Sequence, residues 1–161
     1  MKNKHILWIE DLEHSVADEK CWCESQGFLV KMVNHPARFA EYLERNKENI
    51  RLLILDIMLA GVNNLKTIGV CDSDTLGGRE AGWELVRRFL RSEPKSPYAK
   101  IPVLIVSARM KSERDDEDIF TYSADGMGEI RYIEKRNPDI NWSEQFKNDV
   151  VDLSSIGRNI V

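Results

Sequence analysis

The chain has 161 residues, of which 42% are hydrophobic and 31% charged, as expected for one globular domain that buries its own core. Its 23 basic and 27 acidic residues give a formal net charge of −4, and the basic residues are scattered, which argues against a nucleic-acid partner. No apolar segment reaches membrane-spanning length and no signal peptide follows the first ten residues. We therefore expect no membrane partner and a cytoplasmic location.

The three cysteines form no paired framework of the kind that stabilises small secreted domains. Cys21 and Cys23 lie two positions apart on a predicted helix and so face different ways, and Cys71 lies in an irregular stretch. We expect all three to be reduced thiols, which fits a cytosolic compartment.

Short apolar runs alternate with segments of helical spacing along the whole chain. Strands are predicted at 5–9, 28–33, 52–55, 101–106 and 130–134, and those at 5–9, 52–55 and 101–106 lack polar alternation, which is typical of strands buried on both faces. Helices are predicted at 12–26, from Pro36 through Leu43, at 80–90, at 111–124 and from Trp142 through Leu153, with Gly27 ending the first. Five strands alternating with five helices predict an α/β fold, a doubly wound parallel sheet with both faces covered.

One connection interrupts this regular alternation. Residues 57–81 contain several glycines and asparagines without a sustained period, and so long an irregular segment is usually functional or inserted. We predict a single domain over residues 1–161 with an inserted loop at about 60–81, placed to act as a lid or docking surface. Its Cys71-Asp72-Ser73-Asp74 stretch lacks the spacing of a calcium site and is interpreted as a solvated loop.

Reactive side chains stand at the carboxyl ends of four predicted strands. Glu10 and Asp11 follow the first strand, Asp56 the third, Ser107 the fourth and Lys135 the fifth. In an open parallel sheet these ends line the ligand crevice. Three carboxylates meeting there would repel one another, and a hard divalent cation with oxygen ligands, such as Mg²⁺, would relieve the repulsion. With a hydroxyl and an ammonium group, the set predicts a site for carboxylate attack on a phosphoryl group.

Four short motifs carry a family resemblance. They are Ile-Glu-Asp at 9–11, Leu-Asp-Ile-Met-Leu at 55–59, Val-Ser-Ala at 106–108 and Tyr-Ile-Glu-Lys at 132–135. In this order at strand ends they resemble the signature of receiver domains of two-component response regulators, over nearly the whole chain. The resemblance implies a flavodoxin-like, three-layer αβα fold with strand order 2-1-3-4-5.

The resemblance also implies a chemical role for each strand-end residue. Asp56 would be the phosphoacceptor, taking its phosphoryl group from a phosphohistidine on a sensor histidine kinase or a histidine phosphotransfer protein. Asp11, Asp56 and the backbone carbonyl of Met58 would hold Mg²⁺, and Glu10 would reach the ion through water. Lys135 would balance charge on the phosphoryl oxygens.

Two further residues would act as the switch in such a family member. Ser107 would swing to bind a phosphoryl oxygen, and Tyr132 matches the aromatic residue that turns inward when the hydroxyl moves. The surface that signals to a downstream protein would then be formed by the helix at 111–124, the strand at 130–134 and the last helix.

The chain departs from the family pattern in four ways. Glu10 stands where aspartate is commoner, and Lys135 is followed by Arg136-Asn137-Pro138 instead of directly by proline. The glycine and helix that normally follow the acceptor after a short loop begin only at Gly82. Only 26 residues, 136–161, follow the lysine, so we expect a stand-alone receiver without a DNA-binding output domain.

Three functions compete on this pattern. The leading one is a phosphorylation-switched signalling module that catalyses its own phosphorylation and dephosphorylation but is no enzyme for an external substrate. The alternative is a pseudo-receiver, a protein-interaction module independent of phosphorylation. The third, a metal-dependent phosphohydrolase, is disfavoured because Met58 stands where such enzymes place a second aspartate. Arg109, two after Ser107, could restrict access or engage an anion, and we expect a slowly decaying phosphate.

Each candidate also has a purely structural interpretation. Asp56 could cap a turn, Ser107 could cap a helix, and Lys135 could be a solvated terminal lysine. The acidic run at 113–118 is interpreted as a solvated helix face. The histidines show no ligand spacing and are expected at the surface or in packing; they are His5, His14 and His35.

Overall fold

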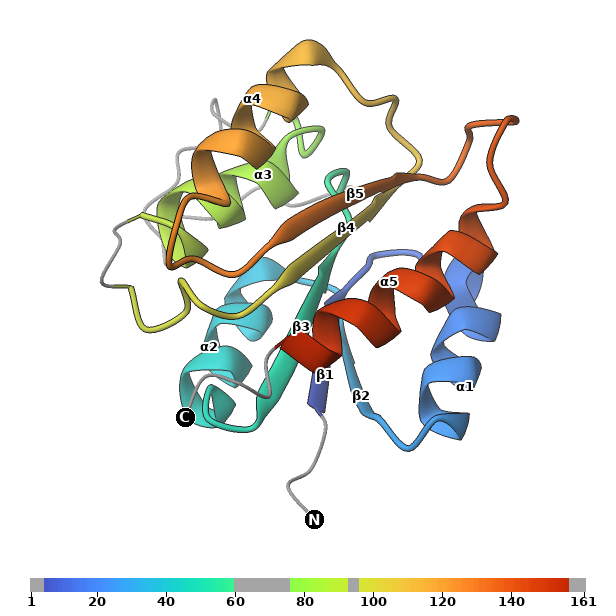
Figure 1. Ribbon diagram of the computed structural model, residues 1–161, viewed down its shortest axis with the longest axis horizontal. Coiled ribbons are helices and arrows are strands. Elements are labelled where there is room, and N and C mark those ends of the chain that lie inside the picture. Colours follow the sequence, from blue (N-terminus) through green and yellow to red (C-terminus); the bar gives the residue numbers. More distant parts are fainter. Residues whose placement is uncertain (1–4, 60–75, 93–95, 157–161) are drawn as a thin grey trace.

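The computed structural model describes residues 5–59, 76–92 and 96–156. A five-stranded parallel sheet runs through the middle of the molecule in the order β2-β1-β3-β4-β5 (Figure 1). Its strands are His5–Ile9 (β1), Leu29–Val33 (β2), Ile50–Leu55 (β3), Val103–Ser107 (β4) and Ile130–Glu134 (β5). The predicted strand order is therefore confirmed.

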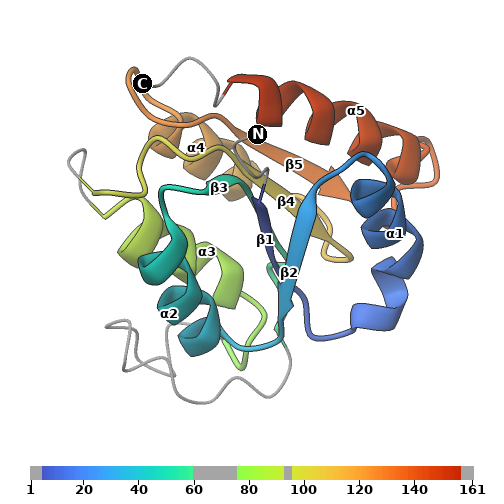
Figure 2. The ribbon, with the colours of Figure 1, turned by 90° about the horizontal axis from the view of Figure 1, so that it is seen from below.

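Five α-helices cover the two faces of this sheet. They are Ala17–Ser25 (α1), Pro36–Asn46 (α2), Ala81–Leu85 (α3), Glu113–Tyr122 (α4) and Trp142–Ile156 (α5). Helices α1 and α5 lie on one face and α2, α3 and α4 on the other, which gives the predicted three layers (Figures 1 and 2). Within the described ranges, no helix combines the length and the apolar character that a bilayer crossing requires.

The unalternated apolar runs supply both sides of the sheet with core residues. Along β1, Ile6 and Trp8 point to the α1 and α5 side, whereas Leu7 and Ile9 point to the α2, α3 and α4 side. Trp8 stacks on Phe146 of α5, with ring centroids 5.3 Å apart. A strand that packs on both faces has no solvent side, which is why these runs carry no polar alternation.

Local signals set the ends of the first two helices as the sequence predicts. Gly27 adopts a φ of 80°, a left-handed conformation that glycine tolerates, directly after the end of α1. Pro36 opens α2, and the Nδ1 atom of His35 accepts a hydrogen bond of 3.1 Å from the backbone N–H of Ala37. Before α1, residues Glu13–Val16 form a 3-10 helix instead of the predicted α-helical turn.

The third helix differs from the prediction in its second half. Instead of one α-helix over 80–90, α3 is followed directly by a π-helix, Val86–Leu90. The backbone N–H of Arg91 bonds to the carbonyl oxygen of Val86 over 2.8 Å, five residues back. Leu85, Val86 and Leu90 are nevertheless buried, as their spacing predicts. Hydrophobic spacing shows which face is buried, but it does not encode this one-residue widening of the turn.

The two ends of the long connection after β3 lie side by side and are joined by backbone hydrogen bonds. The backbone N–H of Leu59 bonds to the carbonyl oxygen of Gly78, and that of Gly82 to the carbonyl oxygen of Ile57, each over 3.0 Å. Residues 60–75 of the predicted insertion, with the Cys71-Asp74 stretch, lie outside the described residues. Of the remaining cysteines, Cys21 is exposed and Cys23 buried, and both are free thiols.

Candidate functional site at the carboxyl ends of the strands

The predicted strand-end residues meet at one edge of the sheet. Glu10, Asp56 and Ser107 come at the carboxyl ends of β1, β3 and β4, and all three are buried. Asp11 and Lys135 lie at the same edge and are partly exposed. Because parallel strands all end on the same side, five polar groups that are far apart in sequence converge on one crevice.

Three carboxylates form a cluster in this crevice. Glu10, Asp11 and Asp56 each offer one carboxylate oxygen, and these atoms all lie within 4.8 Å of one another. In the part of the chain that the structure describes, no other group of three His, Cys, Asp or Glu side chains converges in this way. An all-oxygen donor set with excess negative charge fits a hard divalent cation such as Mg²⁺.

Asp56 is held by two hydrogen bonds to the same oxygen. The Ser107 hydroxyl donates to Oδ1 over 2.7 Å, and the backbone N–H of Met58 donates to Oδ1 over 3.1 Å. Burial raises the pKa of Asp56, and the Ser107 hydrogen bond and the charge of Lys135 offset part of that rise. The carboxylate is therefore fixed in orientation and costs free energy to keep ionised.

Lys135 reaches the acid cluster through Glu10. Its Nζ atom lies 3.0 Å from Oε2 of Glu10, while Oε1 accepts a bond of 3.0 Å from the backbone N–H of Leu12. Burial raises the pKa of Glu10 and the charge of Asp56 raises it further, whereas Lys135 lowers it. The later position of Pro138 thus leaves the lysine side chain pointing into the site, with its backbone N–H bonded to the Ser107 carbonyl over 2.8 Å.

Gly82 explains how α3 packs against Asp56. A Cβ atom at this position would lie 2.2 Å from the carbonyl oxygen of Asp56 and 2.7 Å from the Cα atom of Ile57. Glycine is required here because the first turn of α3 touches the backbone just after β3. The start of this helix therefore packs directly against the backbone of Asp56.

Ser107 and Tyr132 both contact the segment after β4. The backbone N–H of Arg109 donates to the Ser107 hydroxyl oxygen over 3.2 Å, and the Tyr132 hydroxyl donates to the carbonyl oxygen of Arg109 over 2.9 Å. The guanidinium of Arg109 pairs with Asp115 and lies 3.5 Å from Glu80. The anions that this arginine engages in the structure are thus carboxylates of the protein.

The interpretation of residues 113–118 as a solvated helix face is wrong for two of its members. Asp115 is only 1% exposed and forms a reciprocal capping box with Ser112, and Asp118 pairs with Arg87 of the π-helix. The pattern Ser-x-x-Asp at 112–115 is a sequence signal for this cap that the charge count obscures. Asp116 is solvated as predicted.

The histidines take structural positions, as expected. His5 is buried in packing, and His35 caps α2. His14 is exposed in the 3-10 helix before α1.

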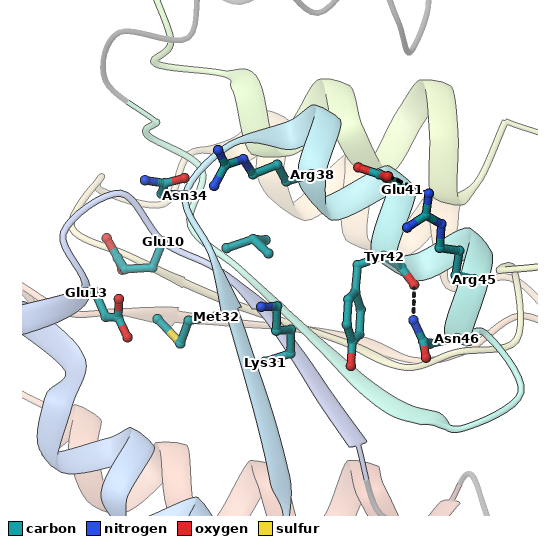
Figure 3. A pocket seen from close by; sticks show the side chains of 11 residues that line it. Glu10, Glu13, Lys31, Met32, Asn34, Arg38, Glu41, Tyr42, Arg45 and Asn46 are labelled. Carbon is teal, nitrogen blue, oxygen red and sulfur yellow. Dashed lines mark hydrogen bonds and ion pairs between the residues drawn. The ribbon is translucent and has the colours of Figure 1, made fainter.

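A groove of about 550 Å³ lies beside the acid cluster, between the edge strand β2 and helix α2 (Figure 3). Eleven residues line it: Glu10, Glu13, Lys31, Met32, Val33, Asn34, Arg38, Glu41, Tyr42, Arg45 and Asn46. Its three basic side chains are matched by three acidic ones, and Arg45 pairs with Glu41 over 2.8 Å. The groove therefore selects no sign of charge, in contrast to the acid cluster.

No protein-family model and no curated protein matches this chain by sequence. Solved structures do match along nearly its whole length. A CheY-like response regulator receiver domain from Methanospirillum hungatei is 17% identical, with a TM-score of 0.61 over 97% of this chain and 98% of that one. A two-component response regulator from Clostridium difficile is 13% identical, with a TM-score of 0.61 over 98% of both chains.

A third match comes from the structure of a complex. A chain of the CheX–CheY–BeF3–Mg complex from Borrelia burgdorferi is 14% identical, with a TM-score of 0.59 over 93% of this chain and 88% of that one. At these identities the likeness establishes the fold. The chain therefore has the CheY-like fold of response regulator receiver domains, with an acidic cluster at the ends of β1 and β3.

Proposed function

We propose that this chain is a signalling receiver that accepts a phosphoryl group on Asp56 from a phosphohistidine of a sensor histidine kinase or phosphotransfer protein. One observation carries the proposal: a buried acceptor carboxylate stands among two further carboxylates, a serine hydroxyl and a lysine ammonium. Acids, hydroxyl and amine at the end of a parallel sheet are the groups that phosphoryl transfer needs for a nucleophile, a cation and charge stabilisation.

In the proposed reaction a carboxylate oxygen of Asp56 attacks phosphorus while the bond from phosphorus to the histidine nitrogen breaks, and the imidazole leaves. Mg²⁺, when bound, would neutralise and align the phosphoryl oxygens. Glu10, Asp11, Asp56 and the backbone carbonyl of Met58 would hold the ion. The residue sets fit this cation because all of these donors are oxygens.

Two side chains of the protein would stabilise the negative charge of the transferred phosphoryl group. Lys135, 3.0 Å from Glu10, would turn its ammonium to a phosphoryl oxygen. The Ser107 hydroxyl, bonded to Asp56 over 2.7 Å, would donate to another. The Tyr132 hydroxyl bonds to the segment that follows Ser107. A shift of that segment would therefore move Tyr132 and change the surface formed by α4, β5 and α5. We propose that a downstream protein partner binds this surface. We also propose that the protein acts in the cytoplasm.

Beryllofluoride, a mimic of the phosphoryl group, tests this proposal without a kinase. With Mg²⁺ present it should change the fluorescence of Trp83, whose indole N–H bonds to Asp115 over 2.5 Å. The Trp83→Phe variant identifies the responding tryptophan, and Asp56→Asn should abolish the response. A parent protein that gives no response at any Mg²⁺ concentration would overturn the proposal.

A second candidate is the phosphorylation-independent pseudo-receiver. It is favoured because polar groups of the site already bond to one another. Glu10 pairs with Lys135, and Ser107 already bonds to Asp56. A module of this kind would bind its partner equally well as the parent and as Asp56→Asn. Partner binding that strengthens with beryllofluoride would exclude it.

An aspartyl phosphohydrolase has weaker support. Met58 contributes its backbone N–H to Asp56, and its side chain offers no acid or base to activate a water molecule. Steady, rapid turnover of a phosphomonoester would revive this reading.

A further inference from the structure

The connection between β4 and α4, residues 108–112, is tied to the acid site and to β5 through its backbone. The N–H of Arg109 donates to the Ser107 hydroxyl oxygen over 3.2 Å, and its carbonyl accepts from the Tyr132 hydroxyl over 2.9 Å. The N–H of Lys111 donates to Oε2 of Glu134 over 3.2 Å. The segment that follows Ser107 is therefore fixed on two sides.

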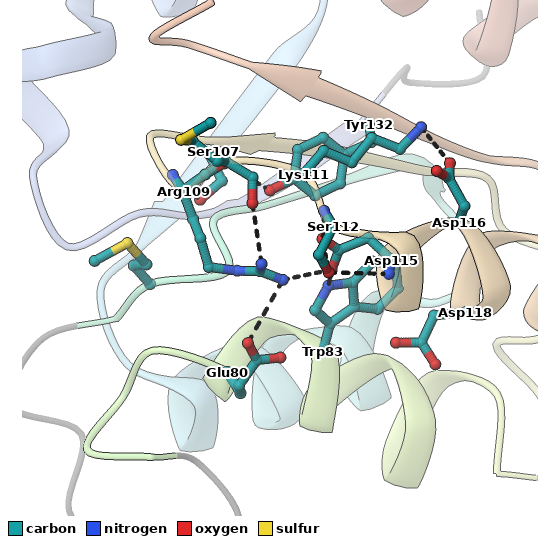
Figure 4. Close-up of polar contacts among 12 residues, drawn as sticks. Glu80, Trp83, Ser107, Arg109, Lys111, Ser112, Asp115, Asp116, Asp118 and Tyr132 are labelled. Atoms are coloured by element: carbon teal, nitrogen blue, oxygen red, sulfur yellow. Dashed lines mark hydrogen bonds and ion pairs between the residues drawn. The ribbon is translucent and has the colours of Figure 1, made fainter.

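A buried carboxylate ties the same connection to two helices (Figure 4). Oδ1 of Asp115 accepts from the guanidinium of Arg109 and, over 2.5 Å, from the indole N–H of Trp83 on α3. Oδ2 accepts from the backbone N–H of Ser112 over 2.5 Å and from its hydroxyl over 2.9 Å. Asp115 thus joins the start of α4, the connection and α3 through one side chain.

The charges in this network favour its assembled form. Burial by itself would raise the pKa of Asp115, but the Ser112 N–H and the Arg109 guanidinium more than offset it and hold the pKa below its ordinary value. Arg109 also lies 3.5 Å from Glu80, at the start of α3. The arginine therefore bridges α3 and α4 at the point where its own backbone holds Ser107.

A continuous path results, from Asp56 through Ser107, Arg109 and Asp115 to Trp83. We propose that Arg109 and Asp115 are positioning residues, which hold the connection after β4 in the place from which the Ser107 hydroxyl serves a phosphoryl group on Asp56. This inference rests on the proposed phosphoacceptor function and adds to it the residues that prepare the site before the group arrives.

The physical reason is preorganisation. A segment that is already ordered costs little further entropy when a ligand binds, whereas a released segment must be ordered at the expense of affinity. The effect is also reciprocal: if the Arg109–Asp115 pair favours the bound phosphoryl mimic, the mimic favours the pair and thereby the placement of α4 against α3.

The test compares beryllofluoride affinity, measured by ¹⁹F NMR at saturating Mg²⁺, in four proteins. In Asp115→Asn the carboxylate charge is lost, and in Arg109→Ala the guanidinium is lost while Asp115 keeps its bonds to Ser112 and Trp83. We expect both to bind about tenfold more weakly than the parent, equivalent to about 1.4 kcal/mol. Affinity for Mg²⁺ alone should stay unchanged because the acid cluster is untouched.

Asp118→Asn is the matched control. Asp118 lies one turn further along α4 and pairs with Arg87, so it also joins α4 to the helix after β3 but makes no bond to Arg109. We expect its affinity for beryllofluoride to match that of the parent. Circular dichroism of all variants confirms that they fold, and Arg109→Ala carries the test if Asp115→Asn does not.

The outcomes separate the two proposals. If the parent binds beryllofluoride and both Arg109→Ala and Asp115→Asn bind it as well or better, the positioning role is overturned and the phosphoacceptor proposal stands. An equal loss in Asp118→Asn also overturns it, because general packing of α4 would then be responsible. If the parent fails to bind the mimic, the phosphoacceptor proposal fails and this inference falls with it.

Discussion

Both ends of the sheet bury charged side chains, but these side chains have opposite kinds of neighbours at the two ends. At the amino ends of β4 and β5, Arg91 is 3% exposed and donates to the carbonyl oxygens of Tyr98, Ile101 and Gly128 over 3.0, 2.7 and 3.2 Å. Burial lowers its pKa to about 10. At the carboxyl ends, by contrast, the buried carboxylates of Glu10 and Asp56 face each other, and burial raises both pKa values.

The difference separates a structural charge from the charges that we propose to be functional. The acceptors of Arg91 are backbone carbonyls of two segments, one before β4 and one before β5, so the cation joins those segments and its hydrogen bonds are internal. The carboxyl-end cluster brings three carboxylates together, and Lys135 offsets part of their negative charge through its pair with Glu10. Repulsion among these carboxylates lowers the stability of the free protein. Binding a cation or a phosphoryl group there would relieve the repulsion and stabilise the folded state.

The largest effect is expected at the amino end. Arg91→Met should lower the free energy of unfolding by about 3 kcal/mol or more, because several buried carbonyl oxygens lose their donor at once. Arg88→Met is the control, since Arg88 lies nearby and is exposed, and its buried partner Glu84 keeps a second pair with Arg87 over 2.6 Å, so the substitution should cost under about 1 kcal/mol. Urea unfolding measures both. A loss at Arg91 no greater than that at Arg88 would contradict the structural role.

The next largest effect is the response of the carboxyl end to Mg²⁺. A ligand at about 100 times its dissociation constant stabilises the folded state by about 2.7 kcal/mol, and thermal unfolding should show a gain of this order in the parent. Asp56→Asn removes one of the three converging carboxylates and should lose most of the gain. An equal shift in both proteins would place the Mg²⁺ effect elsewhere.

Two glycines make a matched pair across the sheet. A Cβ atom would lie 2.2 Å from the Asp56 carbonyl oxygen at Gly82, and 2.5 Å from the Ile101 carbonyl group at Gly128. Each alanine substitution should destabilise the fold by about 1–3 kcal/mol through overpacking. Only Gly82→Ala should also weaken beryllofluoride binding. Equal weakening by Gly128→Ala would show that the acceptor senses general instability instead of local displacement.

The smallest effect is a gain in stability. The folded-state pKa of Asp56 is raised, so the ionised carboxylate opposes folding and this penalty grows as the pH rises through that pKa. Without Mg²⁺, Asp56→Asn should therefore stabilise the protein at pH 7 by about 0.5–2 kcal/mol, as is common where a site trades stability for function.

This gain should shrink as the pH falls toward the ordinary carboxyl range, where the parent also becomes protonated. Denaturant unfolding at several pH values measures the trend. Asp116→Asn, which alters an exposed carboxylate on α4, is the control and should change little. A pH-independent gain would remove the electrostatic explanation.

The sequence predicts the carboxyl end of the sheet much better than the connections around it. Unalternated apolar runs mark buried strands, and topology brings the residue after each run to one edge, so Glu10, Asp56, Ser107 and Lys135 could be found from position alone. Gly82 could be matched to the family pattern, although the reason for it, its approach to the Asp56 backbone, is visible only in the structure.

The rest depends on contacts between segments that the sequence does not relate. Asp115 sits in an acidic run and becomes buried because Trp83 and Arg109 from other elements bond to it. Arg91 ends a helix in which Arg87 and Arg88 look equivalent to it. Arg91 directly follows the π-helix and donates to three carbonyl oxygens. Hydrophobic spacing does not predict the π-helical turn that places it there.

Intact-mass spectrometry after incubation with acetyl phosphate and Mg²⁺ tests the central claim most directly. Asp56 is the buried carboxylate that faces both further acids and the Ser107 hydroxyl. We expect one added phosphoryl group on the parent protein and none on Asp56→Asn. A parent that gains no phosphoryl group, or an Asp56→Asn variant that gains as much, would contradict it.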